Sequence, residues 1–253
     1  MRSFRLAVGL LTVFPVRPTA DVDKTTAARA MLLAPVAVLP LALLAAALGG
    51  AGRLLGLPLY ANGLIFVTVL ALGTRALHLD GLADTVDGLG GGLDRDRALA
   101  IMRTGDIGPM GVVALVLVLG GQVLAASALL TTPATAVVAA LVVCASRACL
   151  GVVCAEGIPA ARPGGLGHLV AGSVHPISAL TSWLGWVVLA ALAGSFVYGG
   201  WSLLVAGLVA SGVLAVLLWR VIRRIGGVTG DVLGAAVELT LTVLLLGAVA
   251  VPG

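Results

Sequence analysis

The sequence predicts an all-α, polytopic integral membrane protein, a helix bundle with about seven transmembrane helices. Hydrophobic residues make up 60% of the 253 residues and the mean hydropathy is +1.17, which is typical of chains that cross a bilayer several times. Only 10% of the residues are charged, and they lie mostly between apolar stretches of about 20 residues. Because no polar block is long enough to build a second core, we expect one membrane domain over residues 1–253.

Each predicted span is an apolar stretch long enough to cross a bilayer. The spans are residues 31–49, 59–77, 110–130, 134–154, 177–198, 201–219 and 232–250. The apolar stretch of residues 6–16 is too short to cross a bilayer, and Pro15 interrupts it near its end. We therefore expect a retained interfacial or re-entrant segment there. The cysteines share one apolar stretch at a spacing that suits neither a metal site nor disulfides, so we expect them to be buried: Cys144, Cys149 and Cys154.

The basic residues between the spans predict the orientation of the chain. They are concentrated before the first predicted span and after the second, fourth and sixth, and these segments share one side if all seven spans cross. By the positive-inside rule this side is the cytoplasmic face of the cell (inner or plasma) membrane, together with the N-terminus and every acidic residue. The basic residues are scattered and aromatic residues are few, so we expect no nucleic-acid partner.

The acidic residues of segment 78–92, HLDGLADTVDGLGGG, predict a cation site. A helix of 100° per residue places Asp80, Asp84 and Asp87 within a sector of about 60°. Hard oxygen ligands without cysteine favour Mg²⁺ or Mn²⁺ over Zn²⁺. His78 points to the opposite face on the same helical count. The glycines that end the segment, Gly90 and Gly91 among them, allow close approach of a phosphorylated ligand.

A second acidic pair lies at the start of the last predicted span. Asp231 and Glu238 are seven residues apart and therefore share a helix face, about 10 Å apart along the axis. Asp231 is also a candidate N-cap. A carboxylate among aliphatic residues is costly unless a cation or a donor meets it, so Glu238 is a candidate ligand of the same metal or of a second one.

Two loops contain candidate phosphate-binding residues. Residues 93–106 predict a short amphipathic helix that ends at Gly105, with Arg103 and Asp106 directly before the next span. Residues 156–176 are rich in proline and glycine around Arg162, whose guanidinium suits a bidentate contact to phosphate. A solvated interfacial helix and a structural loop are the corresponding non-functional interpretations.

These motifs together resemble the cobalamin synthase family, the adenosylcobinamide-GDP ribazoletransferases. The resemblance rests on segment 78–92, on residues 95–111 and 159–167, on TGDVLGAAVE at 229–238, and on the opening 4–16 with its LTVFP. It extends over nearly the whole chain. It implies a transferase that completes the nucleotide loop of vitamin B12.

The resemblance implies a reaction and a set of roles. The 3′-hydroxyl of α-ribazole, or of α-ribazole 5′-phosphate, attacks the cobinamide-linked phosphorus of adenosylcobinamide-GDP and GMP leaves. The residues implied to hold Mg²⁺ are Asp80, Asp84, Asp87, Asp231 and Glu238. An aspartate, Asp80 or Asp84, doubles as general base, with His78 less favoured; Arg103, Asp106, Arg162, Gly90 and Gly91 face the substrate. The bilayer, other cobalamin-pathway enzymes and a second copy of the chain are candidate partners.

Two other functions fit parts of the pattern. A CDP-alcohol phosphotransferase also places aspartates on membrane helices around a metal, but Asp80-Gly-Leu-Ala-Asp84 lacks the arginine and the spacer of that motif. A cation-coupled transporter would use Glu238 and the aspartates as ion ligands. Such a transporter needs a polar path to the far side, where only Arg53 and Asn62 are found.

Overall fold

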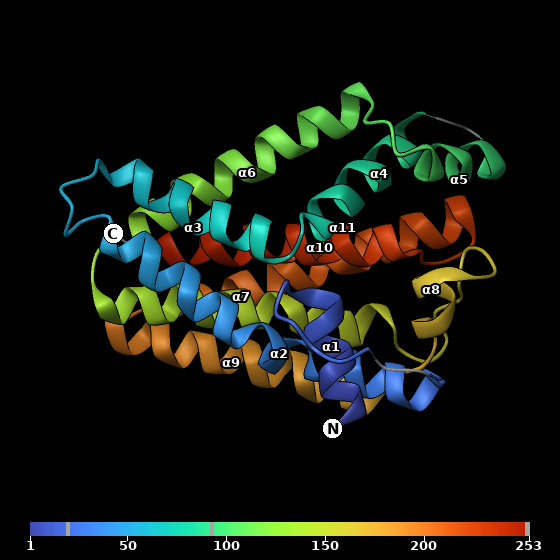
Figure 1. The fold of residues 1–253 in the computed structure, drawn as a ribbon, viewed down its shortest axis with the longest axis horizontal. Coiled ribbons are helices and arrows are strands. Elements are labelled where there is room, and N and C mark those ends of the chain that lie inside the picture. The colour runs from blue at the N-terminus through green and yellow to red at the C-terminus, as the bar shows by residue number, and fades with distance from the viewer. Residues whose placement is uncertain (19–20, 92–93, 251–253) are drawn as a thin grey trace.

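The structure is a computed structural model that describes residues 1–18, 21–91 and 94–250. Its regular elements in these ranges are helices (Figure 1). In chain order they are α1 (Arg2–Leu11), α2 (Lys24–Ala51), α3 (Leu59–Gly73), α4 (Leu77–Gly91), α5 (Arg95–Thr104), α6 (Pro109–Leu129), α7 (Pro133–Val153), α8 (Gly165–Val170), α9 (Pro176–Tyr198), α10 (Ser202–Ile225) and α11 (Gly230–Val249).

The long helices confirm the predicted fold class, a polytopic helical membrane protein. Within the described ranges, six helices are long and apolar enough to cross a membrane, namely α2, α6, α7, α9, α10 and α11. The pair α3 and α4 makes a seventh crossing if both halves are counted as one broken span. In Figure 1 this pair runs from the end that carries the α2–α3 connection and the C-terminus towards the end that carries α5 and α8.

The predicted span 59–77 is wrong as a single continuous helix. Helix α3 ends at Gly73, and α4 leaves it at an angle of 88°. Arg75 and Ala76 at the break have φ values of 56° and 54°, which are unfavourable for residues with a Cβ. The Arg75 guanidinium donates hydrogen bonds of 3.0–3.1 Å to the carbonyls of Thr12, Gly9 and Leu10. The break therefore places Arg75 where it can bind the C-terminal end of α1. Hydropathy cannot predict this contact, because it depends on the tertiary structure.

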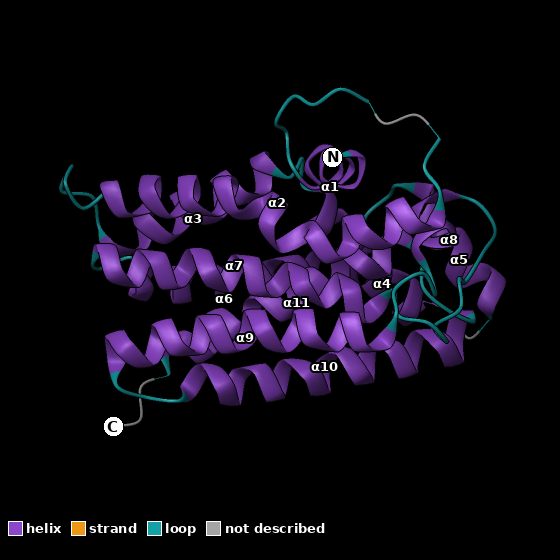
Figure 2. Cartoon of the chain, turned by 90° about the horizontal axis from the view of Figure 1, so that it is seen from below, coloured by secondary structure: helices purple, strands orange, loops and turns teal. Residues whose placement is uncertain are grey.

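Helix α7 lies at the centre of the bundle because its side chains are mostly small and apolar, with Arg147 as the charged exception. It packs against α2, α9 and α11, and most of its residues are buried. Figure 2 shows α2 and α3 on one side of the layer that contains α6, α7 and α11, with α9 and α10 on the other. Helix α1 crosses α2 outside the layers, as expected for a non-spanning segment.

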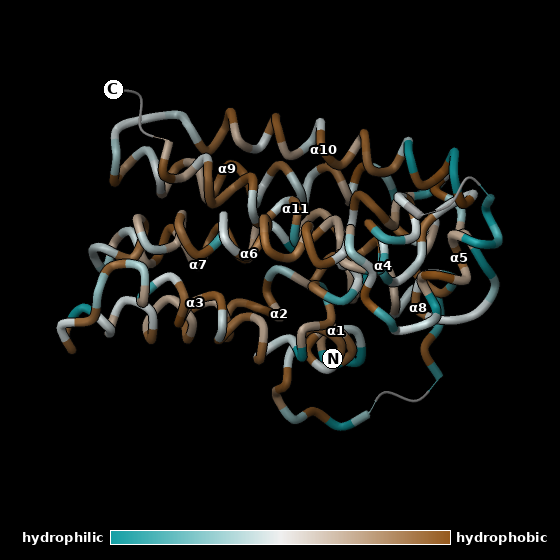
Figure 3. The backbone as a smooth tube through the Cα atoms, turned by 90° about the horizontal axis from the view of Figure 1, so that it is seen from above, coloured by the Kyte–Doolittle hydropathy of each residue, from teal (hydrophilic) through white to brown (hydrophobic). Residues whose placement is uncertain are grey.

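Polar residues gather at one end of the bundle, around α5, α8 and the neighbouring loops (Figure 3). Two of these loops are hydrogen-bonded to each other, since the Ala161 amide donates to Val228 O and the Val228 amide donates to Pro159 O, both at 2.9 Å. The connection after α7 is thereby fixed beside the start of α11. This end holds the residues from which the candidate site is built.

Candidate active site

A close crossing of α4 and α11 brings the two acidic segments together. The helices touch at glycines: a Cβ added to Gly81 would lie 2.6 Å from Asp231 O, and one added to Gly234 would lie 3.0 Å from His78 O. Only residues without a side chain allow backbones to approach this closely. The contact places Asp80 and Asp84 of α4 beside Asp231 in the first turn of α11.

The carboxylates at the crossing form an acidic cluster of Asp80, Asp84 and Asp231. Asp84 is buried and lies within electrostatic range of both other members, and of Arg162. Asp80 is exposed, and Asp231 keeps 21% of its side chain accessible. The Thr229 hydroxyl, which caps α11, donates to Asp231 Oδ2 at 3.0 Å. Three carboxylates thus converge from two helices at the edge of the bundle.

Arg162 is the cation that faces this cluster. Its Nη2 lies 3.8 Å from Asp231 Oδ2, while its buried Nη1 has no hydrogen-bond partner among the described residues. The loop that carries Arg162 is held against α11, because a Cβ on Gly167 would lie 2.7 Å from Thr229 Cα. A buried guanidinium nitrogen without a partner is costly, and a phosphate oxygen satisfies it well.

A cavity of about 260 Å³ opens beside the acidic cluster. Asp80, Arg162 and Asp231 line it on the polar side. Its other walls come from α1, α2, α4, α7, α8 and the start of α11, and they combine leucines and glycines with Met31, His78, His168 and Thr229. A pocket with a few convergent polar groups on an apolar surface is the usual form of a small-molecule site.

Asp80, Asp84 and Asp231 are the described residues at this site that could contribute ligands to a divalent cation. Asp80 and Asp84 accept no hydrogen bond from any residue that the structure describes, so their oxygens are free for coordination. Within the same ranges, no three His, Cys, Asp or Glu side chains lie close enough to form a complete ligand set. Mg²⁺ is usually held by one or two carboxylates together with waters and substrate phosphates, so it does not require a complete set of protein ligands.

The comparisons with known proteins agree along the whole chain. Residues 3–249 match the cobalamin-5-phosphate synthase family. The chain belongs to this family. It is 49% identical over 245 residues to an adenosylcobinamide-GDP ribazoletransferase of Nocardioides sp., covering 96% of each chain. It is 39% identical over 260 residues to the enzyme of that name from Frankia casuarinae, covering 97% of this chain and 94% of the relative. No solved structure matches the chain.

In this cobalamin-5-phosphate synthase family member, Asp87 lies within electrostatic range of Asp84, but both of its oxygens have backbone partners. Its Oδ2 accepts the Gly108 amide and its Oδ1 the Gly111 amide, both at 2.8 Å. These donors are unpaired amides at the N-terminus of α6, where a negative charge is also favoured by the helix dipole. The predicted helix face is therefore real, but its third carboxylate caps a neighbouring helix.

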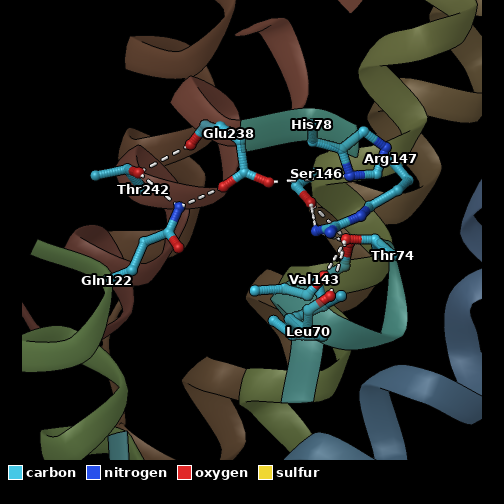
Figure 4. A network of polar contacts seen from close by, with 10 residues as sticks. Leu70, Thr74, His78, Gln122, Val143, Ser146, Arg147, Glu238 and Thr242 are labelled. Carbon is cyan, nitrogen blue, oxygen red and sulfur yellow. Dashed lines mark hydrogen bonds and ion pairs between the residues drawn. The ribbon is translucent and has the colours of Figure 1, made fainter. Parts of the chain in front are cut away.

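Glu238 and His78 belong to a buried network one layer deeper (Figure 4). Glu238 Oε2 accepts from Gln122 Nε2 at 2.8 Å, and its Oε1 lies 3.9 Å from His78 Nδ1. Arg147, only 1% exposed, attracts Glu238 electrostatically and donates to Ser146 Oγ at 2.7 Å. Glu238 thus has protein partners, whereas His78 also lines the cavity of the acidic cluster.

The other predicted substrate residues lie farther out on this family member. Arg103 and Asp106 are exposed at the end of α5 and after it, and neither lines the cavity. Gly90 is exposed, and a Cβ there would make only ordinary contact with Met110 at 3.5 Å. Gly91 ends α4, and Gly92 lies outside the described residues.

Two arginines that were not predicted as site residues make specific contacts in the structure. Arg95 donates from Nε to Ile225 O at 2.9 Å and from Nη2 to Ala161 O at 2.6 Å, so it ties α5 to α10 and to the Arg162 loop. Arg147 lies inside the bundle rather than at its edge. The available signal for Arg147 was a charged residue seven positions before the end of the predicted span 134–154, and Arg95 had no comparable signal.

Proposed function

We propose that this chain transfers the cobinamide phosphate of adenosylcobinamide-GDP to the 3′-hydroxyl of α-ribazole or α-ribazole 5′-phosphate. The observation that carries the proposal is the acidic cluster facing Arg162 at a cavity, in a chain that its family covers almost from end to end. The products are GMP and adenosylcobalamin, or its 5′-phosphate. Carboxylates and a guanidinium are the groups that a diphosphate and an alcohol require.

The proposed step exchanges one phosphorus–oxygen bond for another. The 3′-oxygen of the nucleoside forms a bond to the cobinamide-linked phosphorus, and the bond from that phosphorus to the bridging oxygen of GMP breaks. GMP leaves with that oxygen and its bonding electron pair. The hydroxyl proton passes to a carboxylate of the acidic cluster. Asp84 is our candidate because it is shielded from bulk water and no donor of the described residues occupies its oxygens.

Mg²⁺ is the proposed cofactor. Bound at this cluster, it would neutralise diphosphate charge and polarise the phosphorus under attack. Asp80, Asp84 and Asp231 are the residues proposed to hold it, and Asp87 and Glu238 support the surrounding helices through their own partners. Arg162 is proposed to bind a phosphate oxygen through Nη1.

The site is proposed to face the cytoplasm from the cell (inner) membrane. Arg95, Arg97, Arg103 and Arg162 lie in the α5 and α8 region, at the polar end of the bundle (Figure 3). Basic residues in short connections favour the cytoplasmic side. The acidic cluster at this end would then be accessible to substrates in the cytoplasm.

The direct test is GMP release by purified protein given adenosylcobinamide-GDP and α-ribazole 5′-phosphate, with Mg²⁺ or with EDTA. We expect turnover that requires the metal. Asp84→Asn should lower kcat/KM by about 100-fold or more, because an amide neither accepts the proton nor binds Mg²⁺ as a carboxylate does. Asp96→Asn is the matched control, since this side chain is 88% exposed on α5.

The outcomes of this test differ in meaning. Absence of turnover by folded wild-type protein would defeat the transferase and return attention to CDP-alcohol phosphotransfer and cation transport. Turnover that survives in Asp84→Asn would leave the reaction intact but remove Asp84 from it. Equal losses in Asp84→Asn and Asp96→Asn would point to general damage by loss of charge.

A further inference from the structure

The cavity beside the acidic cluster changes character with depth. Its least exposed walls are mostly apolar: Leu11 of α1, Met31 of α2 and Leu150 of α7 are 3%, 1% and 2% exposed. The buried polar groups among them are Thr229 and His78, and neither ring nitrogen of His78 has a hydrogen-bond partner among the described residues. The side chains of Asp80 and Arg162, by contrast, remain accessible. A ligand that enters therefore meets carboxylates and a guanidinium first and hydrocarbon beyond them.

The size of the cavity decides between the two substrates. At about 260 Å³ it lies at the small end of ligand pockets. A corrin ring with its side chains is several times larger than a nucleoside and cannot enter. Guanine would fit by size, but its carbonyl, ring amide and amino groups need several hydrogen-bond partners, and the buried wall offers mainly leucine and methionine with His78 beside them. A benzimidazole base has one acceptor nitrogen, which a single donor such as His78 satisfies.

We infer that this cavity binds the base of α-ribazole, a dimethylbenzimidazole, and that Leu11, Met31 and Leu150 determine which base is accepted. The inference rests on the proposed function and assigns one of its substrates to a position. With the base inside, the ribose lies at the mouth, where its 3′-hydroxyl meets the acidic cluster. The corrinoid diphosphate then approaches from outside, over Arg162.

Leu150→Ala is the variant that tests the assignment, because it enlarges the cavity at its inner end. We expect direct binding of α-ribazole to purified protein, measured by equilibrium dialysis without corrinoid, to weaken about 10-fold or more. In Leu150→Ala, an analogue whose base carries a third fused ring should bind more tightly relative to α-ribazole than it does in the wild type, by a similar factor. The ratio of the two kcat/KM values should change in the same direction. The KM for adenosylcobinamide-GDP should not change.

Leu214→Ala is the matched control. Leu214 is also 2% exposed but belongs to α10 and does not line the cavity, so this variant should keep the wild-type preference between the two bases. Equal preference in Leu150→Ala and wild type would overturn the inference, as would displacement of bound α-ribazole by GMP, which would assign the cavity to guanosine. Wild-type protein that binds α-ribazole but releases no GMP would defeat the transferase while leaving the nucleoside site.

Discussion

Asp84 and Asp87 lie one helical turn apart on α4, yet their carboxylates have different surroundings. Both carboxylate oxygens of Asp87 accept hydrogen bonds from backbone amides at the start of α6, whereas Asp84 accepts no hydrogen bond from the described residues. Asp87→Ala leaves two backbone amides without an acceptor, so we expect the free energy of unfolding to fall by about 1–3 kcal/mol. Thermal unfolding in detergent measures this loss. Asp84→Asn is the comparison and should unfold at nearly the wild-type temperature.

A pair of opposite charges in the buried network makes a second prediction at this scale. Glu238→Gln leaves the Arg147 guanidinium inside the bundle without an opposite charge. Arg147→Met leaves the Glu238 carboxylate there without an opposite charge. Each single variant should lose about 3 kcal/mol of unfolding free energy. The double variant removes both charges and should lose clearly less than the sum. Additive losses in this double-mutant cycle would show that the two side chains do not interact.

The α4–α11 crossing is the element on which the site depends. Gly81→Ala adds a Cβ 2.6 Å from Asp231 O, so the helices must separate and the acidic cluster must widen. We expect kcat/KM for GMP release to fall at least about 10-fold, because small displacements of reacting groups are costly. Gly120→Ala on α6 is the control, since its Cβ meets nothing within 4 Å. Comparable losses in the two variants would attribute the effect to glycine replacement in general.

The same elements show how far the sequence determined the site. Helical period was enough to predict that Asp80, Asp84 and Asp87 share a face, because that geometry is local. Their partners come from distant helices: Gly234 meets the backbone of His78, and Gly108 meets the carboxylate of Asp87. Hydropathy likewise predicted seven spans, six of which are continuous helices, but it did not predict the break at Arg75 in the span 59–77, where a contact to α1 overrides the apolar pattern.

The whole molecule separates a polar end from a nearly uncharged one, and this gives a test of orientation. The native cysteines are buried and should not react with a membrane-impermeant maleimide. Any labelling can therefore be assigned to an introduced cysteine. Arg97→Cys on α5 should react only in inside-out vesicles. Leu54→Cys, at a residue 90% exposed in the α2–α3 connection, should react in intact cells. The reverse pattern would place the acidic cluster outside the cytoplasm.

Arg75 also has a consequence for the order of assembly during synthesis. Helix α1 leaves the ribosome before α3, but the carbonyls at its C-terminal end are met by a guanidinium more than 60 residues later in the chain. Until α3 has been inserted and the backbone has turned at Arg75, those carbonyls must stay hydrated. The leucines that α1 contributes to the cavity, Leu10 and Leu11, therefore gain this contact only after α3 and the turn at Arg75 have been made. A segment made before α3 thus completes its part of the pocket wall after α3.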